Sequence, residues 1–316
     1  QSGLKKFKGV ASEKEKTKYL SMLGSIIYFA TSTYPELSYA ASKLASFASN
    51  PGPEHFKELE RTAAYFRVDL EKHCIRFSKS ACYTGDPAND PAMHPDGRIK
   101  EDCNLSHFNP ELYVDANFVD DARDPDIEVK QKDMRSRGGV LLKMVGGPCY
   151  WQSKKHTLSL TDLKRKKTAF SPNNGISSIQ NDEEDEKGYI SLHTMESEYI
   201  TMAKGGQIGD KLINLMSEFG FKNVDFAMPI FEDNSACAKL ATNQINRSNG
   251  KHIHLYFHSI KLRIEQGAYE VWQITDADQV ADILTKSLHL KKFKYLTDLM
   301  CGLDIQNMKL KCKFVG

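Results

Sequence analysis

Four carboxylates stand within or next to predicted strands and helices. They are Asp115 within an apolar run, Glu198 in the first turn of an expected helix, Asp233 after a short apolar segment and Asp282 in the last amphipathic stretch. Carboxylates held close together repel one another and raise each other's pKa unless cations neutralise them. Two divalent ions about 4 Å apart can use such a cluster to activate a water and to stabilise the leaving oxygen of a phosphodiester. These residue types therefore indicate metal-dependent hydrolysis.

Spacing alone does not single out this set. The chain has 41 Asp and Glu residues, and a lone Asp at a strand end is more often a cap or a turn residue. Glu198 could belong to a solvated helix face beside Glu196, and Asp282 could serve as a partner of a helix dipole. The metal-site hypothesis depends on whether the fold brings the four side chains together.

An α/β sheet is the architecture that could do so. Short apolar runs bounded by Gly, Pro, Asp or Asn predict strands at residues 111–118, 138–145, 148–153, 228–231 and 268–274, with Gly146–Gly147 as a tight hairpin turn. Apolar positions at helical spacing predict helices at residues 194–219, 235–242, 252–266 and 276–287. This order implies a mixed sheet with helices on both faces. In such a sheet the carboxyl ends of parallel strands share one crevice, which is where the chemistry is found.

The chain divides into four expected parts: a helical segment, a linker, the α/β domain with an inserted loop, and a tail. These parts are residues 1–80, 81–110, 111–290 with the insertion at 161–188, and 291–316. Turn residues interrupt the helical segment, so helices are expected at about residues 13–33, 35–49 and 54–68. The linker and the insertion are rich in polar and charged residues and show little periodicity.

Composition limits the classes of function. The formal net charge is only +2, so contact with nucleic acid must come from local groups of Lys and Arg. No apolar run approaches 18 residues and the N-terminus lacks an apolar core, so we expect neither a membrane span nor a signal peptide. The seven cysteines lack zinc-binding spacing and are typical of free thiols in a reducing compartment. The first residue is not Met, from which we expect a fragment or a processed product.

Several motifs follow one another along the α/β domain: Gly138–Val140, Trp151–Lys155, Glu196–Ile200, Glu232–Ala236, Lys251–Ile253 and Gln279–Lys286. In this order they resemble the ribonuclease H domain of copia-type LTR retrotransposon Pol polyproteins. Three earlier motifs resemble the segment that follows the reverse-transcriptase palm in this family: Gly24–Tyr28, Pro35–Ala40 and Asn50–His55. The resemblance extends from Lys18 to about Leu299, and its specificity comes from the number of motifs in the same order.

The resemblance implies an α/β fold of ribonuclease H type, with a mixed five-stranded sheet flanked by helices, preceded by a small helical segment like a reverse-transcriptase thumb or connection. It implies an enzyme that cuts the RNA strand of RNA/DNA hybrids during reverse transcription, using two Mg²⁺ or Mn²⁺ ions. By position, the family's catalytic metal ligands fall on Asp115, Glu198, Asp233 and Asp282.

Lys154, Lys155, Lys251 and His252 are the candidates for contact with the nucleic acid, although such residues could equally be ordinary surface side chains. Discrimination of the hybrid would come from backbone shape and 2′-hydroxyl contacts. The expected partners are the RNA/DNA hybrid and the upstream palm and fingers of the same polyprotein, without a membrane. The expected location is the cytoplasm, within virus-like particles, or the nucleus.

The chain departs from the family pattern at three places. Phe118 stands where the family usually has Trp, His254 stands where it has Asp, and the insertion at 161–188 separates the hairpin from the helix that carries Glu198. These departures leave open a catalytically degenerate or domesticated copy that only binds hybrids or has a structural role.

The segment Phe118–Asp121 resembles a different motif, the aromatic-x-Asp-Asp box of reverse transcriptases. A polymerase needs fingers and palm strands before this box, whereas here a helical segment and a linker precede it. We therefore expect no polymerase activity from this chain alone.

Overall fold

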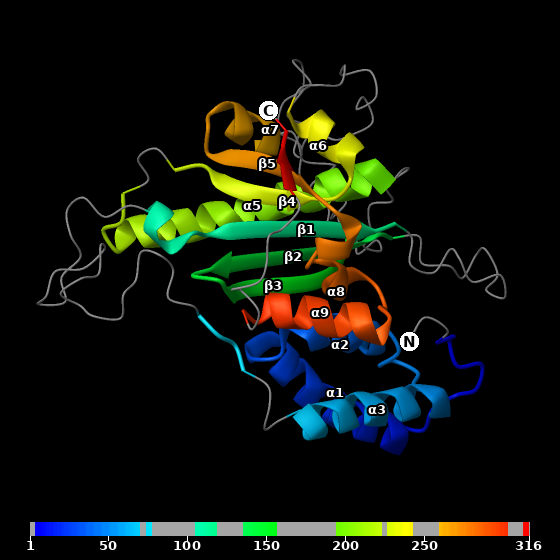
Figure 1. Cartoon of the computed structure of the whole chain (residues 1–316). Helices are drawn as coiled ribbons and strands as arrows, with labels where there is room; N and C mark the ends of the chain where they lie inside the picture. The colour runs from blue at the N-terminus through cyan, green and yellow to red at the C-terminus, as the bar shows by residue number, and fades with distance from the viewer. Residues whose placement is uncertain are drawn as a thin grey trace, which may run out of the picture.

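The computed structural model describes residues 4–69, 74–77, 105–118, 135–156, 194–222, 226–242, 259–302 and 312–315. Within these residues one mixed sheet carries helices on both faces, and a bundle of helices packs below its β3 edge (Figure 1). The predicted α/β fold of ribonuclease H type is confirmed. In the part of the chain that the structure describes, no helix is long and apolar enough to cross a membrane.

The sheet contains all five predicted strands and one more. Its strands are β1 (Glu111–Asn117), β2 (Arg137–Met144), β3 (Gly147–Lys155), β4 (Met228–Glu232), β5 (Tyr269–Ile274) and β6 (Cys312–Phe314), in the spatial order β3-β2-β1-β4-β5-β6. The central strands β1, β4 and β5 pair in parallel, and the remaining neighbours pair antiparallel. The additional strand, β6, lies in the segment predicted as a tail, and three residues are too few to show a strand pattern in the sequence.

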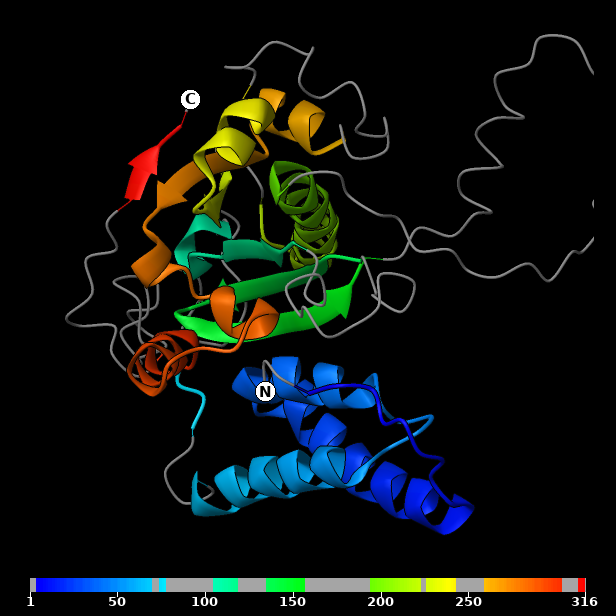
Figure 2. The same ribbon diagram turned by 90° about the vertical axis from the view of Figure 1, so that its right-hand side faces the viewer.

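The helices lie on both sides of the sheet (Figure 2). Helices α5 (Thr194–Glu218), α6 (Ser235–Ala241) and α7 (Ser259–Glu265) cover one face, while α8 (Asp282–Thr285) and α9 (Leu290–Met300) cover the other. Successive side chains of β1 point to opposite faces of the sheet. Leu112 and Val114 pack toward α5, whereas Tyr113 packs with the α8 and α9 residues. Asp115 follows the same alternation and therefore lies on the face of Tyr113.

The turn between β2 and β3 lies one residue earlier than predicted. Val145 and Gly146 have φ angles of 54° and 77°, as the two central positions of a type I′ turn require, and Gly147 is already part of β3. A β-branched residue rarely adopts a positive φ, so the sequence favoured the Gly–Gly pair instead. The backbone N–H of Val145 donates to the carbonyl of Phe108 at 2.8 Å, a contact between distant segments that helps to hold this register.

The helix predicted at residues 276–287 is also wrong in its extent. The structure has a short 3-10 turn, η6 (Asp276–Asp278), and then α8, separated by Gln279 in an extended conformation. The buried Gln279 amide donates to the carbonyl of Val114 at 2.9 Å, and its side-chain oxygen accepts the N–H of Ala281 at 3.2 Å. This tie to β1 interrupts the helix and fixes α8 against the sheet.

The N-terminal segment forms the predicted bundle with a core of its own. It comprises α1 (Glu13–Ser32), η1 (Pro35–Leu37), α2 (Ser38–Ala45) and α3 (Pro53–Asp69), so the helix predicted over 35–49 is shorter and begins with a 3-10 turn. The bundle contacts the sheet through the Trp151 indole N–H, which donates to the carbonyl of Ala30 at 2.6 Å. Arg137 is fully buried, donates to Ser42 and lies over the ring of Tyr39.

Other predicted segments lie outside the described residues. Most of the linker at 81–110 and the whole insertion at 161–188 are in this group, and the end of the linker forms η2 (Leu105–Phe108). Residues 252–258 of the predicted helix 252–266 are also in it. The division of the chain into domains stays a prediction.

Gly139 is where α8 comes closest to the sheet. A Cβ at this position would meet Thr285 Cγ2 at 2.7 Å and Leu284 Cβ at 2.8 Å. We expect Gly139→Ala to lower the free energy of unfolding by about 1–3 kcal/mol, because α8 must move away from β2. Denaturant unfolding monitored by circular dichroism measures the change.

Gly24, in the middle of α1, provides the matched control. No atom lies within 4 Å of a Cβ built there, so Gly24→Ala should raise the free energy of unfolding by up to about 1 kcal/mol through helix propensity. Equal effects of the two substitutions would contradict the close packing of α8 on β2.

Candidate metal centre

The fold brings the four predicted carboxylates to one end of the central strands. Asp115 lies near the end of β1, Asp233 directly follows β4, Asp282 begins α8 and Glu198 lies near the start of α5. Oxygens of Asp115, Glu198 and Asp233 lie within 4.8 Å of one another, and oxygens of Asp233, Asp276 and Asp282 do so as well. Asp233 belongs to both groups. The arrangement offers two adjacent sets of three carboxylates.

Asp276 was missed by the sequence reasoning, which treated it as the beginning of a helix. It lies two residues after the end of β5 and has a side chain that is 75% exposed. A signal was available, because Asp276 follows β5 as Asp233 follows β4, and the carboxyl ends of parallel strands meet at one edge of the sheet.

Burial sets the electrostatics of the first group. Asp115 is 2% exposed and Glu198 is 4% exposed. Burial raises the pKa of Asp115 to about 7, against the opposing charge of Lys286. Burial, reinforced by Glu232, also raises the pKa of Glu198 well above its usual range. Among the described residues, Oε2 of Glu198 has no hydrogen-bond partner, which leaves a buried carboxylate oxygen directed to no protein donor.

Glu232 is a second residue that the sequence reasoning did not select. It is fully buried at the end of β4, and one of its oxygens accepts the backbone N–H of Asn234 at 3.0 Å. Burial and the neighbouring Asp233 raise the pKa of Glu232 well above its usual range. We therefore expect the Glu232 carboxyl, which lies behind the cluster, to be protonated when the site holds no cation.

Neighbouring polar groups orient the carboxylates. The hydroxyl of Thr285 donates to Oδ2 of Asp115, and the Asn117 amide donates to the carbonyl of Thr285 at 3.3 Å. After β4, the Asn234 side chain accepts the N–H groups of Ala236 and Cys237 and so caps α6. These bonds fix the ends of β1 and β4 and, with them, Asp115 and Asp233.

Two lysines bind the second group. Lys286 Nζ lies 2.6 Å from Oδ1 of Asp282 and 3.9 Å from Oδ2 of Asp115. Lys292 Nζ lies 2.7 Å from Oδ2 of Asp282 and 2.8 Å from Oδ2 of Asp276. Burial disfavours the charge of Lys286, but Asp115 and Asp282 outweigh it and hold the pKa of Lys286 above its usual value.

The structure places the two described nucleic-acid candidates on opposite faces of the sheet. Lys154 pairs with Gly138, where a Cβ would point at Thr201 of α5, whereas Lys155 pairs with Arg137. Lys154 is exposed, and its charge together with burial lowers the pKa of Lys204 on α5 to about 8. The other two candidates, Lys251 and His252, lie outside the described residues.

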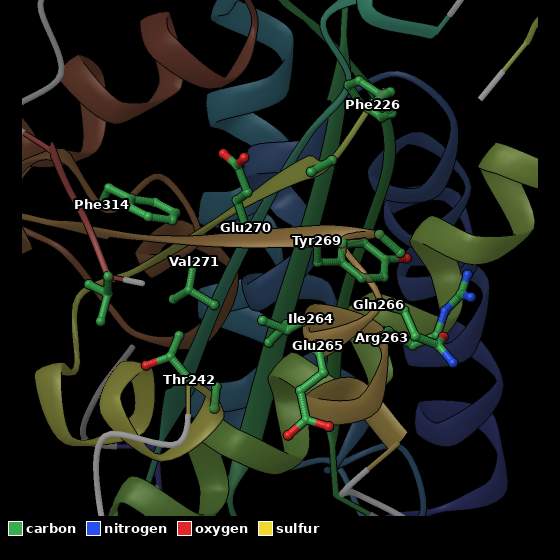
Figure 3. A pocket seen from close by; sticks show the side chains of 15 residues that line it. Phe226, Thr242, Arg263, Ile264, Glu265, Gln266, Tyr269, Glu270, Val271 and Phe314 are labelled. Carbon is green, nitrogen blue, oxygen red and sulfur yellow. The ribbon is translucent and has the colours of Figure 1, made fainter. Parts of the chain in front are cut away.

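A pocket of the described structure lies away from the carboxylates. It has a volume of about 870 Å³ and is lined by residues such as Phe226, Arg263, Tyr269 and Phe314 (Figure 3). These residues flank the amino-terminal ends of β4 and β5, whereas the carboxylates lie at the opposite ends of these strands. Arg263, its cationic residue, is bound to Asp210 at 2.6 Å. The carboxylates therefore remain the candidate site.

Comparison with curated proteins finds transposon sequences. The chain is 25% identical over 278 residues, 88% of its length, to the "Retrovirus-related Pol polyprotein from transposon RE1" of Arabidopsis thaliana. It is 22% identical over 285 residues, 90% of its length, to the corresponding polyprotein from transposon TNT 1-94 of Nicotiana tabacum. The Arabidopsis transposon RE2 polyprotein is 25% identical over 278 residues. The predicted resemblance to retrotransposon Pol polyproteins is confirmed.

The similarity to these Pol polyproteins covers only part of them. The chain spans 14% of the RE1 and RE2 polyproteins and 16% of the TNT 1-94 polyprotein. No family model and no solved structure matches the chain. The comparisons show similarity to one part of Pol polyproteins and do not identify a reaction.

The raised pKa of Asp115 predicts how pH affects the metal-free protein. The Asp115 carboxyl keeps its proton up to about pH 7 in the folded state, whereas its usual pKa is 3.8. Its contribution to the free energy of unfolding is therefore complete below pH 3.8 and is lost as the pH rises toward 7. At pH 8 in EDTA, Asp115→Asn should be more stable than the wild type by on the order of 2–4 kcal/mol. Denaturant unfolding at pH 5 and pH 8 measures this.

The variant and the wild type share the same ten histidines. The difference between their free energies of unfolding therefore reports on Asp115. The Asp115→Asn advantage should shrink as the pH falls from 8 to 5. An advantage that stays constant, or a variant that is less stable at pH 8, would contradict the burial of a carboxylate at Asp115 that Lys286 compensates only in part.

Proposed function

We propose that this chain is the ribonuclease H of a retrotransposon Pol polyprotein and hydrolyses the RNA strand of RNA/DNA hybrids. The observation that carries the proposal is the grouping of Asp115, Glu198 and Asp233 within 4.8 Å at the carboxyl ends of parallel strands. This grouping occurs in a chain that is similar to Pol polyproteins over most of its length.

The residues fit a hard divalent cation. Mg²⁺ and Mn²⁺ prefer carboxylate oxygens, and Glu198 presents a buried oxygen that no described donor satisfies. The two groups that share Asp233 would hold two ions, with Asp115 and Glu198 on one side and Asp282 on the other. When bound, such ions activate a water and neutralise charge on the scissile phosphate.

The chain's own residues have distinct roles in this proposal. Thr285 holds Asp115 in one orientation, and the backbone N–H of Ala116 holds Glu198. Asp233, half-buried, is the ligand common to both positions. The scissile phosphate would lie against the open side of this group, where Asp276 is exposed.

Lys154 and Lys204 supply a candidate contact for the hybrid backbone. Their ammonium groups are close enough for Lys154 to lower the pKa of Lys204, and no carboxylate of the described segments forms a salt bridge with either lysine. Two neighbouring cations without a counter-ion favour an anion such as a backbone phosphate. Selection of the hybrid would follow from its shape and its 2′-hydroxyl groups.

The proposal extends to the context of the chain. The upstream palm and fingers of the same polyprotein would deliver the hybrid, and the helical bundle would lie between them and the sheet. The product would act in the cytoplasm, within virus-like particles, or in the nucleus.

Cleavage of a labelled RNA/DNA hybrid in Mg²⁺ tests the reaction. Asp115→Asn, Glu198→Gln and Asp233→Asn should each reduce cleavage by roughly a hundredfold or more, because each removes a metal ligand. Asp278→Asn is the matched control, since Asp278 lies in η6 but bonds to Thr275 and Tyr295 outside the cluster.

Asp278→Asn should cleave the hybrid as the wild type does. A wild-type protein that binds the hybrid in Mg²⁺ without cutting it would refute the proposed reaction. That result would support the alternative, a degenerate copy that acts by binding.

Binding of an uncleaved hybrid at increasing salt tests the lysine contact. The background is the Asp233→Asn protein. In it, Lys154→Ala and Lys204→Ala should each weaken binding, and each should reduce the dependence of log affinity on log salt concentration by an amount equal to about one phosphate contact. Lys211→Ala, an exposed lysine further along α5, should change neither. Fluorescence anisotropy measures affinity and slope, and an unchanged slope for Lys154→Ala would remove that lysine from the interface.

A further inference from the structure

The cluster contains two sets of three carboxylates, and the two sets differ in the cations that neutralise them. We call Asp115, Glu198 and Asp233 the open triad, and Asp233, Asp276 and Asp282 the lysine-bound triad. Both triads satisfy the same distance criterion of 4.8 Å. They differ because Lys286 and Lys292 form short ion pairs with the second triad and not with the first.

In the lysine-bound triad, each oxygen of Asp282 lies within ion-pair distance of an ammonium group. Oδ1 lies 2.6 Å from Lys286 Nζ and Oδ2 lies 2.7 Å from Lys292 Nζ. Lys292 also holds Asp276 at 2.8 Å. Asp282 is fully buried, so these ammonium groups offset a charge that water cannot reach. A divalent ion that binds Asp282 must displace at least one of them.

The open triad has no such occupant. Lys286, which forms an ion pair with Asp115, lies 3.9 Å from its oxygen, which is beyond hydrogen-bond distance. Glu198 is 4% exposed, and its Oε2 has no hydrogen-bond partner among the described residues. A cation can therefore bind here without breaking a short ion pair.

We infer that the two cation positions fill one after the other, and that Lys286 and Lys292 are internal counter-ions that the second divalent ion displaces. The inference rests on the proposed two-ion function and adds a division of roles within it. The open triad takes the first ion, and the lysine-bound triad takes the second only at higher concentration.

The surroundings of Lys286 allow such a displacement. Its side chain is 35% exposed and lines a cavity of about 270 Å³ between α8 and the helical bundle, together with Glu58 and Tyr65. The ammonium group can therefore leave Asp282 for this cavity without crossing the core.

Calorimetric titration of the metal-free protein with MnCl₂ alone tests the inference. The wild type should take up one ion and then a second at a concentration at least roughly tenfold higher. Lys286→Met and Lys292→Met each remove a positive charge next to the second position while keeping an apolar side chain, so each should strengthen the second binding step by roughly tenfold. Lys294→Met, an exposed lysine of α9, should match the wild type.

Thermal unfolding in EDTA and in MnCl₂ provides the second measurement. Without metal, Lys286→Met and Lys292→Met should melt at a lower temperature than Lys294→Met, because Asp282 loses a counter-ion. Saturating MnCl₂ should recover more of the melting temperature in these variants than in the wild type. Lys286→Arg retains the charge and should restore weak binding of the second ion.

The outcomes separate the inference from the function on which it rests. If wild-type protein binds two Mn²⁺ ions with equal affinity, or if the lysine variants titrate like Lys294→Met, the displacement is wrong and the two-ion function stands. If wild-type protein binds no Mn²⁺ at millimolar concentration, the proposed function fails and the inference fails with it.

Discussion

The main constraint on this structure is that the fold buries several mutually repelling carboxylates side by side. Asp115, Glu198 and Asp282 are each at most 4% exposed, and charges withdrawn from water need compensation. Within the described residues, Lys286 and Lys292 compensate the side of Asp282. The side of Glu198 is left with raised pKa values and an unsatisfied oxygen. A protein that retains this arrangement gives up stability in the metal-free state, as is typical of a site prepared for a cation.

A few contacts of the scaffold hold these carboxylates close together despite their repulsion. Gly139 lets α8 approach β2 closely enough to bring Asp282 toward Asp115, and Gln279 ties the preceding turn to β1. Thr285 then bonds directly to Asp115. Since α8 has only four residues, these tertiary contacts rather than helix propensity hold it in place.

The sequence predicted the elements of the sheet but not every residue of the site. Period-two and helical patterns located the strands and α5, because burial on one or both faces leaves a clear apolar pattern. Asp115, Glu198, Asp233 and Asp282 came from the resemblance, since spacing could not separate them from other carboxylates. The break at Gln279 and the positive φ of Val145 involve contacts with distant β1 and η2, which local patterns do not contain. Strand geometry alone could have predicted that Asp276 lies at the site and that Lys154 and Lys155 point to opposite faces of the sheet.

The helical bundle restricts which surface of the sheet can meet a long substrate. It packs next to β3, the strand at this edge of the sheet, and it binds through Trp151 and Arg137. Arg137 pairs with Lys155 across the hairpin, so Lys155 is half-buried, whereas Lys154 faces α5 and remains exposed. Under the proposed function, a hybrid that reaches the open triad would therefore extend along the α5 side, where Lys154 and Lys204 lie. The bundle and Lys286 would then limit the approach from the other side.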